Sequence, residues 1–478
     1  MTNIFEFFKS KNFKFGFVAL IMAAAVIAIT AIVNFLVAGV NVKWDLTPNK
    51  MYSIGDTTTK LLEGLQKDVE IVFLIDRDRI VGGDNGFLVA EFLDKYDKFG
   101  RIKVNYIDPD KNPDIISKLD KEGILELKKE DIIVKCGDRV KKLTVADVFQ
   151  YSDPYAMDSQ LFVGEQSITG AIKYVTSDRI PTIYFIEGHG EKILDSEYST
   201  IKQSLELNSY AVKTLNLTLE EKVPEDTEIL ISAAPQMDFA SNEKDKISEY
   251  LQNGGKAIFL MEPVNTAKKF TNIEGILEKY NIGINYDRVK ETDSNRHIPQ
   301  NEFQIVPDIG SNELTSNLDL RQFFVVIPES RSFRVLDPEN TSIEINKLLT
   351  SSYTSEGVPF DSSAEGGNSK GPLDIALTAK DSSTKDSKVV VIGNASFATD
   401  ATIQSFPYAQ NAIHLFFNSI IWMHDDSNDL IIMPKTPELD SITVTGFQAM
   451  VTMMVTILAI PILLIAAGIF IWLRRRHL

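Results

Sequence analysis

The sequence predicts an α/β protein in which two soluble units lie between two membrane-spanning helices. Three observations lead to this prediction. An uncharged apolar segment occurs near each end, strand-like runs alternate with amphipathic helices between them, and 478 residues are too many for one ordinary core. The net charge is −17 at pH 7, and no basic patch with interleaved aromatic residues occurs, which argues against a nucleic-acid partner.

The two apolar segments are long enough to cross a bilayer. Residues 15–40 contain no charged residue, and a helix of about 26 residues extends ~39 Å. Residues 447–473 are also uncharged and include Pro461, which a membrane helix tolerates when neighbouring groups satisfy the freed carbonyl. The alternative for the first segment is a cleaved signal peptide, but the apolar core of a signal peptide usually has only ~7–15 residues. We therefore predict two transmembrane helices.

Basic residues next to these segments predict the orientation of the chain. Positive residues favour the cytoplasmic side of a membrane helix. They are concentrated before the first segment and after the second, at Lys9, Lys11, Lys14, Arg474, Arg475 and Arg476. We expect residues 1–14 and 474–478 to be cytoplasmic and residues 43–443 to lie outside the plasma membrane. Trp44 and Trp472 occupy positions typical of an interfacial aromatic belt.

The first predicted soluble unit covers residues 43–177. Its pattern contains a strand, a helix, a second strand, the start of a second helix and a hairpin, at residues 68–75, 87–99, 102–107, 113–119 and 131–143. This βαβαββ order suits a thioredoxin-like layered architecture. Cys136 is the only cysteine, so the chain has no CxxC motif, no internal disulfide and no multi-cysteine metal site. We expect this unit to be a scaffold rather than a redox enzyme.

The second predicted unit covers residues 178–425. Continuous aliphatic runs alternate with helical patterns, and the runs lie at residues 182–187, 211–215, 228–233, 256–261 and 388–393. Such runs indicate a parallel sheet covered by helices on both faces. Residues 285–387 interrupt the pattern, and within them the Ser- and Gly-rich stretch 351–372 is expected to be a mobile loop. Residues 426–443 form a linker back to the membrane.

The sharpest local motif is Gly188-His189-Gly190-Glu191, which directly follows a predicted strand. The carboxyl ends of parallel strands are where ligands bind in open sheets, so His189 and Glu191 are candidates for contact with a ligand or partner. The glycines permit a tight turn with positive φ. One histidine and one glutamate do not make a catalytic triad. We therefore prefer a structural turn or a binding contact to catalysis.

Other motifs give no cofactor, metal or catalytic site. Residues 108–112 begin like a calcium loop, but Pro113 and Leu119 replace the glycine and the bidentate glutamate. The glycine-rich residues 82–86 lack the lysine and hydroxyl residue of a Walker loop. The remaining histidines do not have metal-ligand spacing, and no GxSxG nucleophile motif occurs. We predict that the chain is not an enzyme.

Five stretches spread along the chain carry a resemblance to a known family. They are residues 44–54 (WDLTPNKMYSI), 165–169 (EQSIT), 188–191 (GHGE), 254–256 (GGK) and 391–400 (VIGNASFATD). In this order, with an apolar segment near each end, they resemble the auxiliary component of ABC-type transport systems of the gliding-motility GldG type. No single motif is specific, but their order is.

The resemblance implies that residues 178–425 form a flavodoxin-like domain similar to class I glutamine amidotransferases, which is also found in intraflagellar-transport proteins. In true amidotransferases a cysteine nucleophile follows a core strand. Here the predicted strand 256–261 leads into Glu262-Pro263, so the domain looks noncatalytic. The resemblance also implies two partners, an ABC permease and a cytoplasmic ATPase, in an export or cell-envelope machine. Because the chain has no Walker motif, ATP hydrolysis would belong to the partner.

The leading prediction is therefore a noncatalytic, membrane-anchored accessory subunit of an ABC-type transporter. Two alternatives stay open at this point. One is an extracytoplasmic enzyme that acts on envelope glycans or amides through His189 and Glu191, and turnover by residues 43–443 would favour it. The other is a sugar- or peptide-binding sensor with residues 285–387 as a lid, and thermal stabilisation by a specific ligand would favour that. The transported substrate, the direction of transport and the stoichiometry do not follow from the sequence.

Overall fold

A computed structural model describes most of the chain between the two apolar segments. The described residues are 11–39, 45, 50, 52–79, 85–121, 123–151, 160–264, 269–315, 324–337, 341–359, 368–405, 410–424, 432, 453–454, 457 and 460–476. Some predicted features lie outside them, namely residues 1–10, Trp44 with most of its motif, residues 82–84, and most of residues 426–443 and 447–459. The chain divides into two compact units, Met1–Lys435 and Thr436–Leu478, and each is described by itself.

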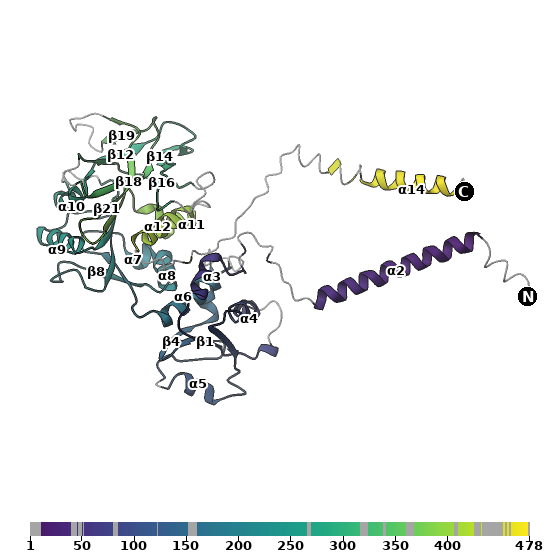
Figure 1. Ribbon diagram of the computed structural model, residues 1–478. Coiled ribbons are helices and arrows are strands. Elements are labelled where there is room, and N and C mark those ends of the chain that lie inside the picture. The colour runs from purple at the N-terminus through teal and green to yellow at the C-terminus, as the bar shows by residue number, and fades with distance from the viewer. Residues whose placement is uncertain are drawn as a thin grey trace, which may run out of the picture. The chain divides into compact units, whose positions relative to one another are not determined.

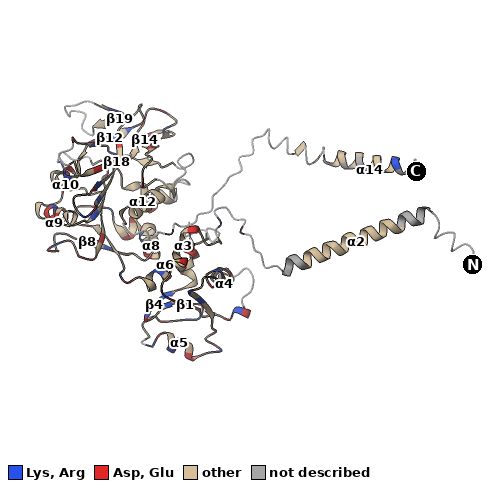
Figure 2. Cartoon of the chain, viewed as in Figure 1, with Lys and Arg blue, Asp and Glu red and all other residues tan. Residues whose placement is uncertain are grey.

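The compact unit Met1–Lys435 begins with the helix α2 (Lys11–Gly39). Its stretch Phe17–Phe35 is long and apolar enough to cross a membrane, a criterion that a signal sequence also meets. Figure 2 shows no charged residue along the described middle of this helix. The other compact unit contains α14 (Ile460–Arg476), whose apolar stretch Pro461–Arg474 is shorter than a membrane span. Of the described residues, therefore, only α2 provides a helix of membrane-spanning length.

The residues after α2 build a four-stranded sheet in the order β2-β1-β3-β4. The strand β1 (Val69–Phe73) pairs in parallel with β2 (Ile102–Tyr106) and antiparallel with β3 (Ile132–Cys136), which forms a hairpin with β4 (Arg139–Leu143). These strands match the predicted ones. Smaller elements complete this part: α3 (Asp56–Glu63), η2 (Arg77–Arg79), α4 (Asn85–Tyr96), α5 (Asp114–Leu119), η3 (Val145–Val148), β5 (Phe149–Tyr151), β6 (Gln160–Phe162) and α6 (Gly164–Thr176).

A second, larger sheet follows in the order β11-β17-β21-β22-β10-β9-β7-β8. Five neighbouring strands of this sheet are mutually parallel: β7 (Thr182–Ile186), β8 (Ala211–Leu215), β9 (Thr227–Ala233), β10 (Lys256–Leu260) and β22 (Ser387–Ile392). One face packs against α7 (Leu194–Glu197), α8 (Ser199–Leu207) and α12 (Gln410–Met423), and the other packs against α9 (Ser241–Gln252) and α10 (Thr271–Leu277). The predicted parallel sheet with helices on both faces is confirmed (Figure 1).

Residues 285–387 extend this architecture with antiparallel strands. The strands β15 (Asp308–Ile309), β17 (Phe333–Val335), β18 (Ile343–Thr350) and β21 (Asp374–Asp381) join the large sheet, and β17 pairs with β11 (Ile282–Ile284), which lies just before these residues. The prediction of a mobile loop at 351–372 is wrong for two described segments. The strand β19 (Glu356–Pro359) pairs with both β12 (Asp287–Lys290) and β20 (Ser369–Lys370), because backbone hydrogen bonds form a sheet even where side chains are small. The remaining elements are η5 (Glu278–Tyr280), β13 (His297–Ile298), β14 (Asn301–Ile305), β16 (Ile327–Pro328), η6 (Ser396–Ala398) and α11 (Asp400–Ser405).

The helix α6 joins the two sheets. It packs against β3 and β4 of the small sheet and crosses α8 of the large one. At the crossing, Ser209 Oγ donates a hydrogen bond to the carbonyl oxygen of Gly170 over 2.5 Å. Near the start of α6, Glu165 accepts a 2.7 Å hydrogen bond from the backbone N–H of Gly55, which precedes α3. The EQSIT motif, residues 165–169, therefore lies fully buried at the junction of the two soluble parts.

Candidate functional site

The GHGE turn lies where the connectivity of the large sheet reverses. It follows β7, and the next two strands along the chain, β8 and β9, lie on opposite sides of β7. Such a reversal is the usual place for a ligand crevice. Gly188 and Gly190 have φ angles of +119° and +78°, which glycine permits in a tight turn. The backbone N–H groups of Gln236 and Met237, from the loop after β9, donate to the carbonyl oxygen of His189 over 2.8 and 3.1 Å.

The imidazole of His189 is enclosed between two carboxylates. Its Nδ1 lies 3.0 Å from an oxygen of Glu191, and its Nε2 lies 2.8 Å from an oxygen of Glu243 at the start of α9. The side chains of His189, Glu191 and Glu243 are 9%, 2% and 1% exposed. The ring of Phe239 packs edge-on against the imidazole, with the centroids 4.9 Å apart. Both ring nitrogens are therefore engaged inside the protein.

Glu243 ties three loops together at the carboxyl edge of the sheet. Besides its contact with His189, it accepts hydrogen bonds from the backbone N–H of Ala240 and from Thr218 Oγ1, each over 2.8 Å. Thr218 lies in the loop after β8, and Ala240 ends the loop after β9. No motif in the sequence singles out Glu243. Its only local signal is its place as the third residue of α9, where a carboxylate can cap a preceding N–H.

The two carboxylates favour a protonated imidazole. Burial alone lowers the pKa of His189, but hydrogen bonds to Glu191 and Glu243 and their negative charges outweigh burial and raise that pKa. Burial alone raises the pKa of Glu243, but hydrogen bonds from Ala240, Thr218 and His189 outweigh it and lower that pKa. The arrangement suits a charged clamp that holds loops in place. Glu187, Gly188 and Gly190 are the residues near this turn that are exposed to solvent, whereas His189 is buried.

We expect this clamp to give stability a defined pH dependence. The contribution of His189 is fully present below its unfolded pKa of about 6.5 and is lost as the pH rises through the raised pKa of the folded state. The contribution of Glu243 is present above its ordinary pKa of 4.5 and is lost as the pH falls through its lowered pKa. The wild-type protein should therefore have a larger free energy of unfolding than the His189→Gln variant, and this difference should be largest between about pH 4.5 and 6.5. Denaturation at a series of pH values measures this difference, and a constant difference up to about pH 9 would contradict the clamp.

The residue that follows β10 and Met261 is also engaged. Glu262, which follows β10 and Met261, accepts a 2.7 Å hydrogen bond from the backbone N–H of Ser396 and a second one from its hydroxyl. Lys192 Nζ lies 3.7 Å from the same carboxylate. Glu262 thus joins the loop after β10 to the loop after β22, at the same edge of the sheet as His189.

The other candidate residues lie apart from one another. His297 Nδ1 lies 2.8 Å from the Ile298 carbonyl, and His424 Nε2 lies 2.8 Å from the Tyr210 hydroxyl. Burial lowers the pKa of His414. Asp108, which is 5% exposed, accepts a hydrogen bond from the N–H of Asp110. The described residues contain no group of three or more His, Cys, Asp or Glu suited to hold a metal, and His477 lies outside them.

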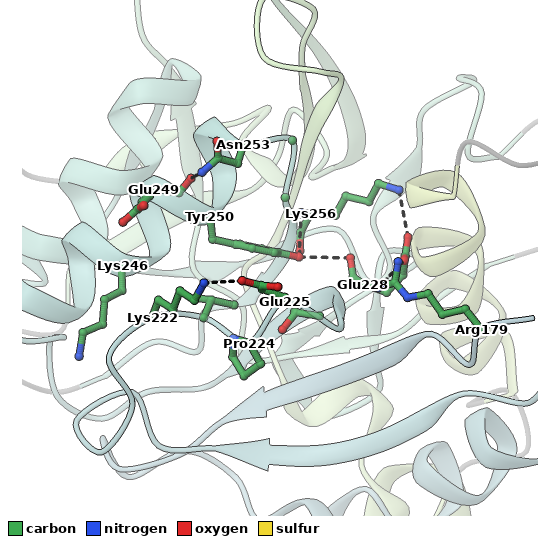
Figure 3. A pocket seen from close by; sticks show the side chains of 14 residues that line it. Arg179, Lys222, Pro224, Glu225, Glu228, Lys246, Glu249, Tyr250, Asn253 and Lys256 are labelled. Carbon is green, nitrogen blue, oxygen red and sulfur yellow. Dashed lines mark hydrogen bonds and ion pairs between the residues drawn. The ribbon is translucent and has the colours of Figure 1, made fainter.

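The GGK motif lines a polar cavity at the opposite, amino edge of the sheet (Figure 3). The cavity has a volume of about 420 Å³. Lys256 and Arg179 approach the Glu228 carboxylate to 3.2 and 3.9 Å, and Tyr250 Oη accepts a hydrogen bond from the Lys256 N–H. Gly254 has a φ of +90°. The motif therefore shapes the turn between α9 and β10.

Comparisons with known proteins match both soluble parts to protein families. Residues 180–304 match the family described as "ABC-type uncharacterized transport system", and residues 48–148 match "Domain of unknown function (DUF7088)". A comparison with curated proteins finds no match. The first of these families is the one that the ordered motifs were predicted to indicate.

Solved structures also resemble part of the chain, at low sequence identity. The "mmIFT52 N-terminal domain" is 17% identical, with a TM-score of 0.40 over 52% of this chain and 98% of that one. A ThuA-like protein from Bacteroides uniformis is 15% identical, with a TM-score of 0.33 over 52% and 93%. A glutamine amidotransferase from Thermotoga maritima is 12% identical, with a TM-score of 0.26 over 53% and 89%. These scores support no assignment of activity. The family match at residues 180–304 confirms the resemblance of this chain to the GldG-type auxiliary component of ABC-type transport systems.

Proposed function

We propose that this protein is a noncatalytic accessory subunit of an ABC-type transporter, anchored in the cell membrane with its soluble units outside the cytoplasm. The observation that carries the proposal is the match of residues 180–304 to a family of ABC transport systems. The partners would be the permease and a cytoplasmic ATPase. The engagement of both His189 nitrogens and of Glu262 with neighbouring protein groups supports a noncatalytic role.

The proposed organisation keeps the predicted boundaries. Residues 15–40 and 447–473 would be the membrane helices, with cytoplasmic ends at 1–14 and 474–478. Residues 43–177 would be a thioredoxin-like unit, and the sheet order β2-β1-β3-β4 with parallel β1 and β2 supports this. Residues 178–425 would be the amidotransferase-like domain with its insertion at 285–387, and residues 426–443 the linker. The basic residues that flank the two apolar segments support the orientation.

The carboxyl edge of the large sheet is the surface that we propose for contact with the permease. Three large apolar side chains are exposed there, Ile193 at 63%, Leu219 at 81% and Met237 at 58%. They follow β7, β8 and β9, and the loops that carry them are joined by His189 and Glu243. Exposed apolar residues on a rigid, polar-rimmed edge are typical of protein–protein contacts. In this proposal the GHGE residues, Gly188, His189, Gly190 and Glu191, position the contact surface.

Affinity purification of the full-length protein in mild detergent tests the proposal. The permease and the ATPase should be recovered with it. We expect Leu219→Glu and Met237→Glu each to weaken this recovery about tenfold or more, because a charge would be buried in an apolar contact. The matched control is Ile124→Glu, which changes a side chain of 73% exposure outside this edge. A chain that is recovered alone, or equal recovery by all three variants at unchanged melting temperature, would contradict the proposal.

A further inference from the structure

A groove of about 560 Å³ lies beside the first residues of β21. Residues of β17 and β18 line it together with the start of β21, and β18 and β21 are labelled in Figure 1. Its apolar lining comes from Phe333, Val335, Ile345, Pro372 and Leu373. Phe333 and Leu373 are buried, whereas Val335 is 45% exposed. Clefts of this size that combine an apolar lining with a few placed polar groups are typical of ligand sites.

The charged residues of this groove leave one positive charge without a carboxylate partner. They are Arg334, Lys347 and Asp374. Lys347 Nζ lies 2.8 Å from an Asp374 oxygen, so these two charges offset each other. Arg334 is exposed and makes no ion pair in the described part of the chain, and its Nη1 donates to two neutral oxygens, the Ile284 carbonyl at 2.7 Å and Asn285 Oδ1 at 2.8 Å. Two cations and one carboxylate therefore give the lining an excess of one positive charge.

Neighbouring groups hold the Arg334 side chain in place. A Cβ atom at Gly283 would lie 2.9 Å from Arg334 Cγ, Nε and Cζ, so the side chain lies close against the backbone of β11. The Asn285 amide that accepts from Arg334 is itself oriented, because its Nδ2 donates to Ser332 Oγ over 2.9 Å. Ser332 Oγ in turn donates to Asp287 over 2.7 Å. A guanidinium held in this way loses little conformational freedom when it binds an anion.

The strand β17 also has a free backbone edge next to the groove. On one side, β17 pairs with β11 along all three of its residues. On the other side it pairs with β21 at one position, where Phe333 is opposite Asp374. Beyond that position Val335 has no second strand partner among the described residues. An unpaired strand edge can accept an extended peptide, whose backbone adds hydrogen bonds while its side chains enter neighbouring pockets.

We propose that this groove binds the carboxyl terminus of a peptide that ends in an apolar residue. The terminal carboxylate would pair with the Arg334 guanidinium, since arginine presents planar N–H groups that match a carboxylate. The last side chain would pack on Val335 and Ile345, and the preceding backbone would follow the free edge of β17. In the sheet order, β10 and β22 lie between β9 and β21, so this groove is separate from the surface proposed for the permease.

Thermal denaturation of the full-length protein in detergent tests the groove. The probe is the acetylated tripeptide alanyl-alanyl-leucine with a free carboxyl terminus, at millimolar concentration. It should raise the melting temperature by about 2 °C or more, because a ligand that binds the folded state stabilises it. Two matched probes should raise it by less than half as much. The same tripeptide with a terminal amide lacks the carboxylate, and 4-methylpentanoate lacks the peptide backbone. Sodium chloride at equal ionic strength is the reference for charge screening.

Three variants locate the binding site. Arg334→Gln removes the unpaired positive charge and should abolish the shift. Gly283→Ala keeps this charge but forces the Arg334 side chain away from β11, so it should weaken the shift. The control is Lys279→Gln, which removes an exposed positive charge of η5 that does not line the groove and should keep the shift. Because Arg334 is exposed, its variant tests the groove even if Gly283→Ala fails to fold.

Several results would overturn the proposal. The absence of a shift with the free tripeptide would mean that the groove holds only water. Equal shifts from the acid and the amide would show that the carboxylate is not recognised, and an unchanged shift in Arg334→Gln would place binding elsewhere. An equal shift from 4-methylpentanoate would make a free apolar acid the occupant instead of a peptide.

Discussion

Replacing Gly170 with alanine is expected to lower the free energy of unfolding by about 3 kcal/mol or more, and to let the two soluble parts unfold separately. A Cβ atom at Gly170 would lie 1.6 Å from the carbonyl oxygen of Leu207 and 2.8 Å from its carbonyl carbon. Both are backbone atoms of α8 and cannot move aside as a flexible side chain would. The helices α6 and α8 would have to separate, and the hydrogen bonds that Ser209 and Gln166 make across the crossing would be lost.

The helix propensity of the new residue works against this loss. Alanine in place of glycine within a helix stabilises by about 1 kcal/mol, so the expected destabilisation is a net value. Gly275→Ala in α10 is the matched control, because a Cβ there would meet only the side chain of Lys244, at 3.7 Å. It should be neutral or slightly stabilising. Denaturant titration followed by far-UV circular dichroism, with limited proteolysis of the same samples, measures both effects. A Gly170→Ala protein with a single transition at the wild-type midpoint would show that the helices do not cross as closely as described.

The strands and helices that repeat one strong local pattern could be predicted from the sequence. The runs 182–187 and 256–261 are continuous and apolar because both faces of the parallel sheet are covered there, and β7 and β10 lie within them. Parts of 285–387 could not be predicted in this way. The strand β20 has two residues, and β12 pairs with β19 some seventy positions later, so neither leaves a periodic signal of its own.

In the candidate site, too, features that depend on neighbouring residues could be predicted from the sequence, whereas contacts between residues far apart in the chain could not. A positive φ was expected at Gly188 or Gly190 from the residue types of a tight turn, and both residues have one. The contact between His189 and Glu243 joins residues 54 positions apart, which no local pattern can indicate. The polar residues of the turn, His189 and Glu191, made a contact with a ligand or partner one of the two interpretations of the sequence. The structure directs both polar side chains inward, where their first partners belong to the protein itself.

Replacing Glu243 with alanine is expected to cost about 3–5 kcal/mol, as when one partner of a buried ion pair is removed. The substitution takes away the acceptor for three donors at once, namely His189 Nε2, Thr218 Oγ1 and the backbone N–H of Ala240. A buried donor that loses its partner keeps its desolvation penalty, about 1–3 kcal/mol for each group. Deprotonation of His189 would relieve part of this cost, because the neutral imidazole tolerates burial better than the cation.

A substitution on the same helix gives the control for this effect. Glu249→Ala removes an exposed carboxylate of α9 and should change the free energy of unfolding by less than about 0.5 kcal/mol. Glu243→Gln keeps the volume and one oxygen acceptor, so it should cost less than Glu243→Ala. If the clamp acts as described, His189→Gln in the Glu243→Ala background should cost less than it does alone, by about 1 kcal/mol or more. Equilibrium denaturation near pH 6 measures all five variants, since both members of the pair are charged there. Additive effects, or a cost of Glu243→Ala below about 1 kcal/mol, would show that the loops are held by their backbone hydrogen bonds and not by the histidine between its two carboxylates.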